Sequence, residues 1–164
     1  MNIFRIDKSF DYSSLNIDFD LIHAGLNDYI HSTDANIARH TKKDLYNGGT
    51  PNFGLSYFDK LILDVRLGQA NIQSFHILYD YALIMKYKLD TIYAHGFICE
   101  KKYLLMKEQA NQIVKLSLIC RNRFIMLSKN NYDCNDTFIK KIIKLRDLSK
   151  QFVEAFIQLK HPFS

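Results

Sequence analysis

The sequence predicts an all-α protein, a compact bundle of about five helices with a short extended arm at the amino end. Three observations predict this fold. Apolar residues recur at helical spacings of three and four wherever the pattern is strong. Glycine and proline number only six and two in 164 residues, and this scarcity favours long helices over a many-turned sandwich or barrel. The composition, 48% hydrophobic and 24% charged, is that of one ordinary globular domain.

The first 18 residues are expected to lie outside the helical domain. Their apolar residues alternate weakly, which indicates an extended arm with at most one short strand over residues 3–12. Residues 19–164 are therefore predicted to form a single helical domain. No apolar run approaches the roughly 18 residues of a membrane-spanning helix, and the charged opening MNIFRIDKSFD does not resemble a signal peptide. We therefore expect a cytoplasmic protein that does not enter a membrane.

Three shorter helices are predicted before the last two. The first covers residues 20–33 and has aspartates at its start that can cap it. Residues 34–53 follow and contain the strongest cluster of turn-forming residues in the chain. Helical spacing resumes over residues 55–65 and again over residues 71–88. The next stretch is ambiguous, and Gly96 marks a break in it.

The last two helices, residues 100–129 and 137–160, carry the clearest 3-4 pattern. Because only a short polar loop separates them, they should pack antiparallel and form the stability core, with Phe124 and Phe152 pointing inward. Further apolar residues widen the apolar face beyond one seam, namely Leu105, Leu118, Ile119, Ile143 and Ile157. An apolar surplus of this kind predicts a protein partner or a homo-oligomer, unless the helices simply enclose a larger core.

Positive charge is concentrated in the second half of the chain. The formal charge of +5 divides into −2 for residues 1–90 and +7 for residues 91–164. A basic half can bind an acidic protein or a nucleic acid, or it can consist of solvated helix faces. Arg121 and Arg123 precede the aromatic Phe124 by three residues and by one residue, but an inward Phe124 cannot stack on a base. Nucleic acid is therefore the lesser alternative.

The motifs of the common enzyme classes are missing from the sequence. It contains no G-x-S-x-G, no P-loop, no G-x-G-x-x-G and no H-E-x-x-H. We therefore expect no catalytic residue, no cofactor and no metal. Tyrosines of the third helix, Tyr79 among them, can line an amphipathic pocket for a small molecule or can simply pack in the core.

Three cysteines, Cys99, Cys120 and Cys134, are an odd number without C-x-x-C spacing, which predicts free thiols in a reducing compartment. His95 and Cys99 lie four residues apart and could form a nucleophile pair or half of a metal site. Gly96 lies between them and makes a continuous helix doubtful. The pair is therefore expected to be a histidine at a turn and a buried structural cysteine.

A family resemblance begins at NGGTPNFGLSYFDKLILDV, residues 47–65. This Gly/Pro turn, the NFGL that follows and the amphipathic helix resemble the C-terminal region of the butirosin-type acyltransferases, which serve peptide and aminoglycoside natural-product assembly. Residues 19–30, residues 94–110 and a last helix with Glu154 fall in a similar order. The resemblance covers roughly residues 19–160. Its motifs are short and apolar.

The resemblance implies a module without chemistry of its own. Members of that family carry the catalytic cysteine in an N-terminal papain-like half, and the residues before the matching region contain no cysteine. The expected function is therefore a helical accessory or substrate- or partner-binding module in peptide or small-molecule biosynthesis. The alternative is a regulatory bundle that binds an acidic protein or nucleic acid through its basic half, and a free-standing enzyme is the third. The candidate binding residues are Tyr79, His95, Cys99, Arg121 and Arg123.

Overall fold

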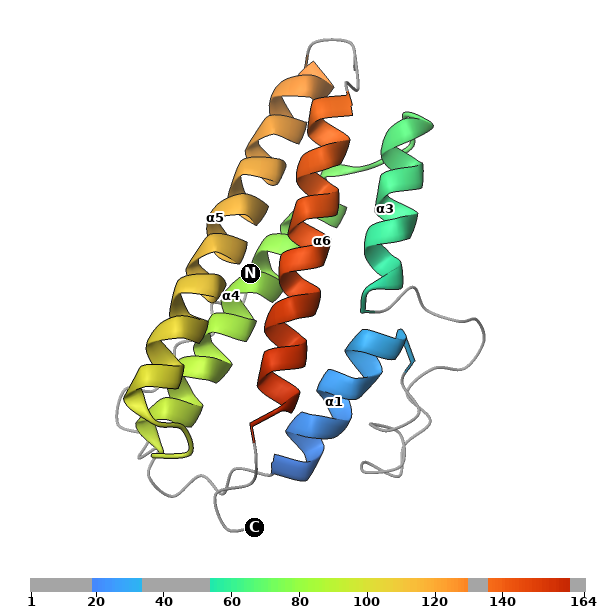
Figure 1. Ribbon diagram of the computed structural model, residues 1–164. Helices are drawn as coiled ribbons and strands as arrows, with labels where there is room; N and C mark the ends of the chain where they lie inside the picture. The colour runs from blue at the N-terminus through green and yellow to red at the C-terminus, as the bar shows by residue number, and fades with distance from the viewer. Residues whose placement is uncertain (1–18, 34–53, 130–135, 160–164) are drawn as a thin grey trace, which may run out of the picture.

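The computed structural model describes residues 19–33, 54–129 and 136–159, and within these ranges it contains five helices and no strand. The helices are α1 (Phe19–His31), α3 (Ser56–Arg66), α4 (Ile72–Ala94), α5 (Glu100–Lys129) and α6 (Asp136–Ile157) (Figure 1). The predicted all-α fold is confirmed. The amino-terminal arm and the turn cluster of residues 34–53 lie outside the described residues.

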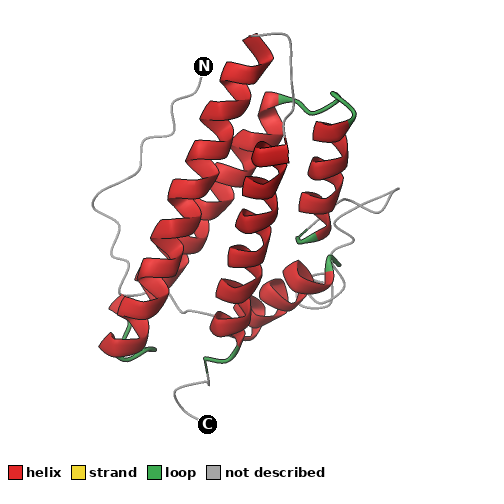
Figure 2. Cartoon of the chain, turned by 45° about the horizontal axis from the view of Figure 1, so that its top comes forward, coloured by secondary structure: helices red, strands yellow, loops and turns green. Residues whose placement is uncertain are grey.

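The helices pack side by side and occupy four positions around one core. The long helices α4, α5 and α6 form three of them, and α5 runs antiparallel to both of its neighbours (Figure 1). The short helices α1 and α3 share the fourth position, and both pack against α6. Figure 2 shows the two short helices on the same side of α6 again, with α3 beside its first half and α1 beside its second. The expected antiparallel packing of the last two helices is thus confirmed.

The carboxyl end of α1 is joined to the amino end of α3 by backbone contacts. The amide of Leu55 donates a hydrogen bond to the carbonyl of Tyr29 over 3.0 Å. The amide of Ser56 donates to Oγ of Ser32 over 2.8 Å, and α3 has no cap from the side chain of its own N-cap residue. Ser32 therefore supplies a cap from the end of one helix to the start of the next.

Helix α4 is longer than the sequence pattern predicted, because it continues past Lys88 to Ala94. Leu89 and Ile92 extend its apolar stripe and are 0% and 1% exposed, so tertiary packing holds the last turns in place. The helix ends where Gly96, with φ of 75°, adopts the left-handed conformation and donates its amide to the carbonyl of Tyr93. Gly96 is thus the predicted break.

The α4–α5 connection is fixed by a polar and aromatic cluster. The rings of Tyr93 and Tyr103 stack with centroids 3.8 Å apart. The hydroxyl of Tyr103 donates to Asp90 over 2.9 Å and accepts from Nζ of Lys107 over 2.7 Å. The hydroxyl of Tyr103 thus both donates and accepts a hydrogen bond, so packing and hydrogen bonding account for the cluster.

Aromatic side chains fill the centre of the bundle. Phe124 and Phe152 are 2% and 0% exposed, which confirms that both point inward. The Phe75 ring stacks on Phe124 at 4.4 Å and lies 5.6 Å from Phe138. These rings join α4, α5 and α6, so one core holds the three long helices. None of the helices in the described ranges is both long and apolar enough to span a membrane.

Candidate functional site: the groove between α5 and α6

The five residues that the sequence singled out for binding do not form one site. Tyr79 and Arg121 meet, with the Arg121 guanidinium 4.6 Å above the centre of the Tyr79 ring, so this pair ties α4 to α5. His95 and Cys99 lie in the α4–α5 connection, about 24 Å along α4 from Tyr79 at 1.5 Å per residue. Arg123 also lies on α5 but on a different face from Arg121. Residues two positions apart in a helix point in directions that differ by about 200° around its axis.

His95 makes its hydrogen bond with α4 and not with Cys99 in the described part of the chain. His95 ends α4, and its Nδ1 lies 2.8 Å from the carbonyl oxygen of Thr91, which holds the ring against its own helix. The prediction that Cys99 is buried is wrong, because Cys99 lies in the exposed turn before α5 rather than on the inner face of a helix. Within the described ranges, no three His, Cys, Asp or Glu side chains are grouped so that they could hold a metal ion.

A groove does lie between α5 and α6, with a volume of about 220 Å³. It is lined by Gln112, Lys115, Leu116, Ile119, Lys144 and Leu148. The α5 members follow helical spacings of three and four, which place them along one side of that helix. Lys144 and Leu148 are likewise four residues apart on α6. The groove therefore has an apolar floor of three aliphatic side chains with a lysine from each helix at its rim.

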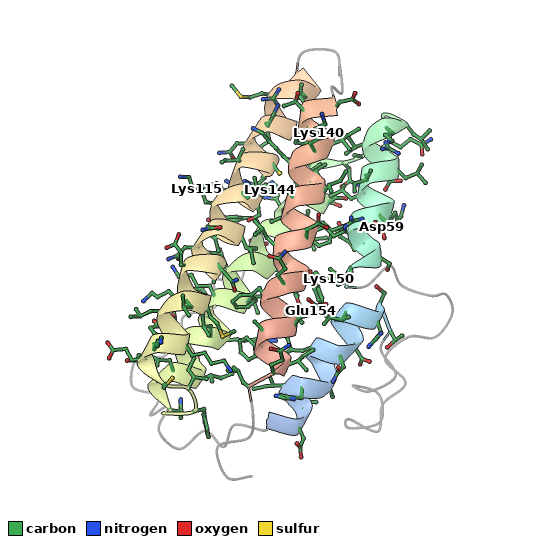
Figure 3. The ribbon with its side chains drawn as sticks, in the orientation of Figure 1. Asp59, Lys115, Lys140, Lys144, Lys150 and Glu154 are labelled. Atoms are coloured by element: carbon green, nitrogen blue, oxygen red, sulfur yellow. The ribbon has the colours of Figure 1, made fainter. Side chains whose placement is uncertain are left out.

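The lysines of the groove have no acidic partner in the part of the chain that the structure describes. Figure 3 shows Lys115 and Lys144 at about the same height on α5 and α6, with Lys140 nearer to the amino end of α6. No ion pair joins these three lysines to a carboxylate of the described residues. Asp59 pairs instead with Arg146, over 2.8 Å, on the side of α6 that faces α3. Among the described residues, no carboxylate is thus paired with the positive charges on the groove side of α6.

Arg123 continues the α5 side of the groove. It lies four residues after Ile119 and seven after Leu116, so the three share one helix face. The Nε of Arg123 is buried, and no acceptor within the described ranges takes a hydrogen bond from it. A buried guanidinium N–H without an acceptor is costly, so a carboxylate bound beside Arg123 would be stabilised there.

Cys120 follows Ile119 on α5 but does not line the groove. Its side chain is 0% exposed, and burial raises the pKa of the thiol to about 11, while the nearby positive charge of Lys141 acts in the opposite direction. A thiol with a raised pKa is a poor nucleophile at neutral pH. Cys120 is therefore a packing residue.

The sequence pattern indicated only part of this groove. It marked Ile119 as surplus apolar surface and Arg123 as a binding residue, but it gave no reason to single out Lys115. One feature of the sequence could have indicated the groove. On both α5 and α6, lysines lie close to apolar residues that fall outside the main apolar stripe. The chain matches no known family model, and neither curated proteins nor solved structures give a significant match, so its resemblance to the butirosin-type acyltransferases stays a prediction.

Proposed function

We propose that this protein is a non-catalytic binding module whose α5–α6 groove takes an acidic amphipathic helix of a partner protein. The observation that carries the proposal is the apolar floor between two lysines, Lys115 and Lys144, that have no acidic partner among the described residues. Among the expected functions, this one develops the regulatory bundle that binds an acidic protein through its basic half.

The apolar residues of α5 support a helix as the ligand. Leu105, Ile119 and Met126 are 65%, 38% and 67% exposed, and Gln112 lies seven residues from two of them. Residues that recur every seven positions lie along one face of a helix, and a second helix that packs alongside it contacts residues at this spacing. Helices that dock in this way place apolar anchors at intervals of three, four and seven into a groove.

The charges of the groove support an acidic ligand. Lys115, Lys140, Lys144 and Arg123 all lie along the α5–α6 seam, whereas Glu108 lies next to Gln112, to which its carboxylate is hydrogen-bonded over 3.2 Å. The positive charge of the groove is therefore concentrated toward one end, away from Glu108. Such asymmetry would orient a bound helix and raise the association rate of a partner with the complementary charge.

A nucleic acid fits the groove less well than a protein helix. Single strands are held by basic side chains together with exposed aromatic rings on which bases stack. The groove is lined by aliphatic side chains, and Phe124, the aromatic residue nearest to the arginines in sequence, is buried. A phosphate backbone would leave Leu116, Ile119 and Leu148 without an apolar contact.

Fluorescence anisotropy with a synthetic helix tests the proposal. The probe carries Leu at the core heptad positions and Glu at the flanking ones, and the matched peptide carries Gln in place of Glu. We expect the acidic peptide to bind at least about tenfold more tightly than the Gln peptide at low salt, with affinity falling as salt is added. The double variant Lys115→Glu/Lys144→Glu should lose this preference. The control variant Lys86→Glu/Lys101→Glu changes the net charge equally and should retain it.

Two results would contradict the proposal. Equal binding of the two peptides would show that charge plays no part, and unchanged binding by Lys115→Glu/Lys144→Glu would place the contact elsewhere. A labelled single-stranded oligonucleotide serves as the competing ligand. Tighter binding of the oligonucleotide than of the acidic peptide, lost in the same double variant, would replace the protein partner with a nucleic acid.

A second candidate function rests on a separate hollow of about 240 Å³ between α1, α3 and α4. Tyr29, Tyr57 and Tyr81 line it, and the rings of Tyr29 and Tyr81 stack with centroids 4.9 Å apart. A planar apolar molecule would suit such walls, which supports the small-molecule role expected from the family resemblance. Titration with indole should shift the ring-proton NMR signals of these tyrosines, and Ile77→Trp, which fills the hollow, should abolish the shift. Unshifted signals would remove this candidate.

A further inference from the structure

We propose that two copies of this chain associate through the outward face of α4, packed antiparallel about a two-fold axis at Ile84. This interface is separate from the α5–α6 groove and does not depend on the function proposed for it.

The outward face of α4 is unusually apolar. Ile77, Ile84 and Tyr87 are 56%, 49% and 64% exposed, and they follow one another at spacings of seven and three. They lie on the side of α4 opposite to the buried stripe of Phe75, Ala82 and its neighbours. Figure 1 shows α4 behind α5 and α6, and the exposure of the three side chains indicates that these helices do not cover this side of α4. Exposed apolar side chains in one row mark an interaction surface.

The surface beside this row is hollowed. A cavity of about 250 Å³ lies where Ile22 of α1 approaches Ile84, Tyr87 and Lys88 of α4. The tyrosine-lined hollow adjoins the other end of the row, at Ile77. Such a surface offers room for side chains of another molecule, which a tightly closed helix face does not.

The charged residues on this face of α4 indicate which kind of partner binds there. Asp80 and Lys88 lie four residues before and four residues after Ile84, and both are exposed. Neither forms an ion pair with a described residue. Within one helix they are about 12 Å apart along the axis, too far to pair with each other. Desolvation by burial lowers the pKa of Lys88, and a carboxylate brought close to Lys88 would act in the opposite direction by favouring its charged form.

A two-fold axis at Ile84 places each residue before position 84 beside the residue equally far after it in the other copy. Ile84 then meets Ile84, and Ile77 meets Thr91. Asp80 of each copy lies beside Lys88 of the other, which gives two equivalent ion pairs at the rim of an apolar centre. A heterologous partner would need no such symmetry about one residue. The pattern therefore favours a second copy.

Charge reversal tests the arrangement with the intact chain. We expect the wild-type protein to sediment as a dimer and the single variants Asp80→Lys and Lys88→Asp each to dissociate at least about tenfold more readily, because like charges face each other twice. An equimolar mixture of the two variants should form a heterodimer, since both ion pairs are then restored with reversed sign. The double variant Asp80→Lys/Lys88→Asp should dimerise again. Because all these positions are exposed, circular dichroism should show unchanged helix content.

Several outcomes would overturn the proposal. A wild-type protein that remains monomeric at about 100 μM would do so, since an interface of biological size associates below that concentration. Single variants that stay dimeric, or a mixture that does not reassociate, would exclude this face or this orientation. If the protein is monomeric and a cysteine introduced by Ile84→Cys resists alkylation, another segment of the same chain covers the face instead. The groove variant Lys115→Glu/Lys144→Glu should remain dimeric, which separates the two proposals.

Discussion

Gly54 lies directly against the backbone carbonyl of Tyr29, so closely that a Cβ at Gly54 would overlap the carbonyl oxygen. Gly54 also has a φ of 61°, a conformation that disfavours every residue with a side chain. Two independent constraints thus select glycine where α1 meets α3. This contact sets how closely the two short helices approach while they cover α6.

Gly54→Ala should therefore destabilise the protein more than Gly96→Ala. Gly96 has a similar φ of 75°, but a Cβ there meets nothing within 4 Å. Gly96→Ala should lower the free energy of unfolding by about 1–2 kcal/mol, which is the cost of placing a residue with a side chain in the left-handed conformation. Gly54→Ala should lower the free energy of unfolding clearly more, because its Cβ also clashes with the backbone of Tyr29, which cannot rotate away as a side chain could. Urea unfolding of both variants measures the difference, and equal losses would show that the α1–α3 joint can open at little cost.

Ser32→Ala should cost about 1 kcal/mol of unfolding free energy, because the amide of Ser56 loses the acceptor that caps α3. Ser32 has a φ of 55°, so Ser32→Gly removes the same hydroxyl while relieving the backbone conformation. The glycine variant should therefore be the more stable of the two. Thermal unfolding compares both variants with the wild-type protein. An unchanged stability of Ser32→Ala would contradict the capping role, and an alanine variant more stable than the glycine variant would contradict the argument from the backbone conformation.

Phe152→Ala should destabilise the protein by about 3–5 kcal/mol, because the ring is fully buried between the helices. Met126→Ala is the matched control, since Met126 is 67% exposed and its truncation should change stability by less than about 0.5 kcal/mol. Chemical denaturation of the two variants should separate them clearly. A loss below about 1 kcal/mol for Phe152→Ala would show that the core can collapse around the missing ring.

Cys99 should react with iodoacetamide in the native protein at about pH 8, whereas Cys120 should not. Cys99 is exposed, and Cys120 combines full burial with a pKa raised to about 11. Mass spectrometry of the alkylated peptides distinguishes the two sites, and addition of urea should make them equally reactive. Labelling of native Cys120 at the rate of Cys99 would mean that α5 and α6 separate readily.

Stability should fall in alkaline solution. Burial raises the pKa of the Cys120 thiol from 9.0 to about 11, so the unfolded chain loses this proton first. The stabilisation is fully present below pH 9.0 and is lost as the pH rises to about 11. Burial also raises the pKa of Tyr81 well above 10.0, which extends the loss to higher pH. The variants Cys120→Ala and Tyr81→Phe should each show a shallower decline in unfolding free energy above pH 9, and unchanged slopes would contradict the assignment.

The periodicity of the sequence was sufficient to predict the helices, because each buried stripe is a local pattern. The end of α4 was harder to place, since Leu89 and Ile92 have no turn signal beside them and are held by packing against other helices. The exposure of Cys99 could not be predicted, because it depends on where the connection after Gly96 leads the chain.

The candidate site was less predictable than the fold. Lys115 and Lys144 are 29 positions apart in sequence, and only the register between two antiparallel helices brings them to one groove. In the same way, the register between α4 and α5 brings Arg121 to the ring of Tyr79. Helical periodicity fixes the face on which a residue lies, but it does not fix the height at which two helices align, since sliding one turn preserves the apolar seam.

The short connection between α4 and α5 has a consequence for the order in which the molecule folds. Only residues 95–99 separate these two helices, whereas α1 reaches α6 across on the order of 100 residues of chain. Loop-closure entropy therefore favours early pairing of α4 with α5 and late docking of α1. In native-state hydrogen exchange we expect the amides of α1 and α3 to open before those of the long helices. Such an opening would uncover one side of α6 and remove the hollows that α1 and α3 form with α4, while the groove between α5 and α6 stays intact. A partly unfolded molecule would therefore keep the groove but lose the tyrosine-lined hollow.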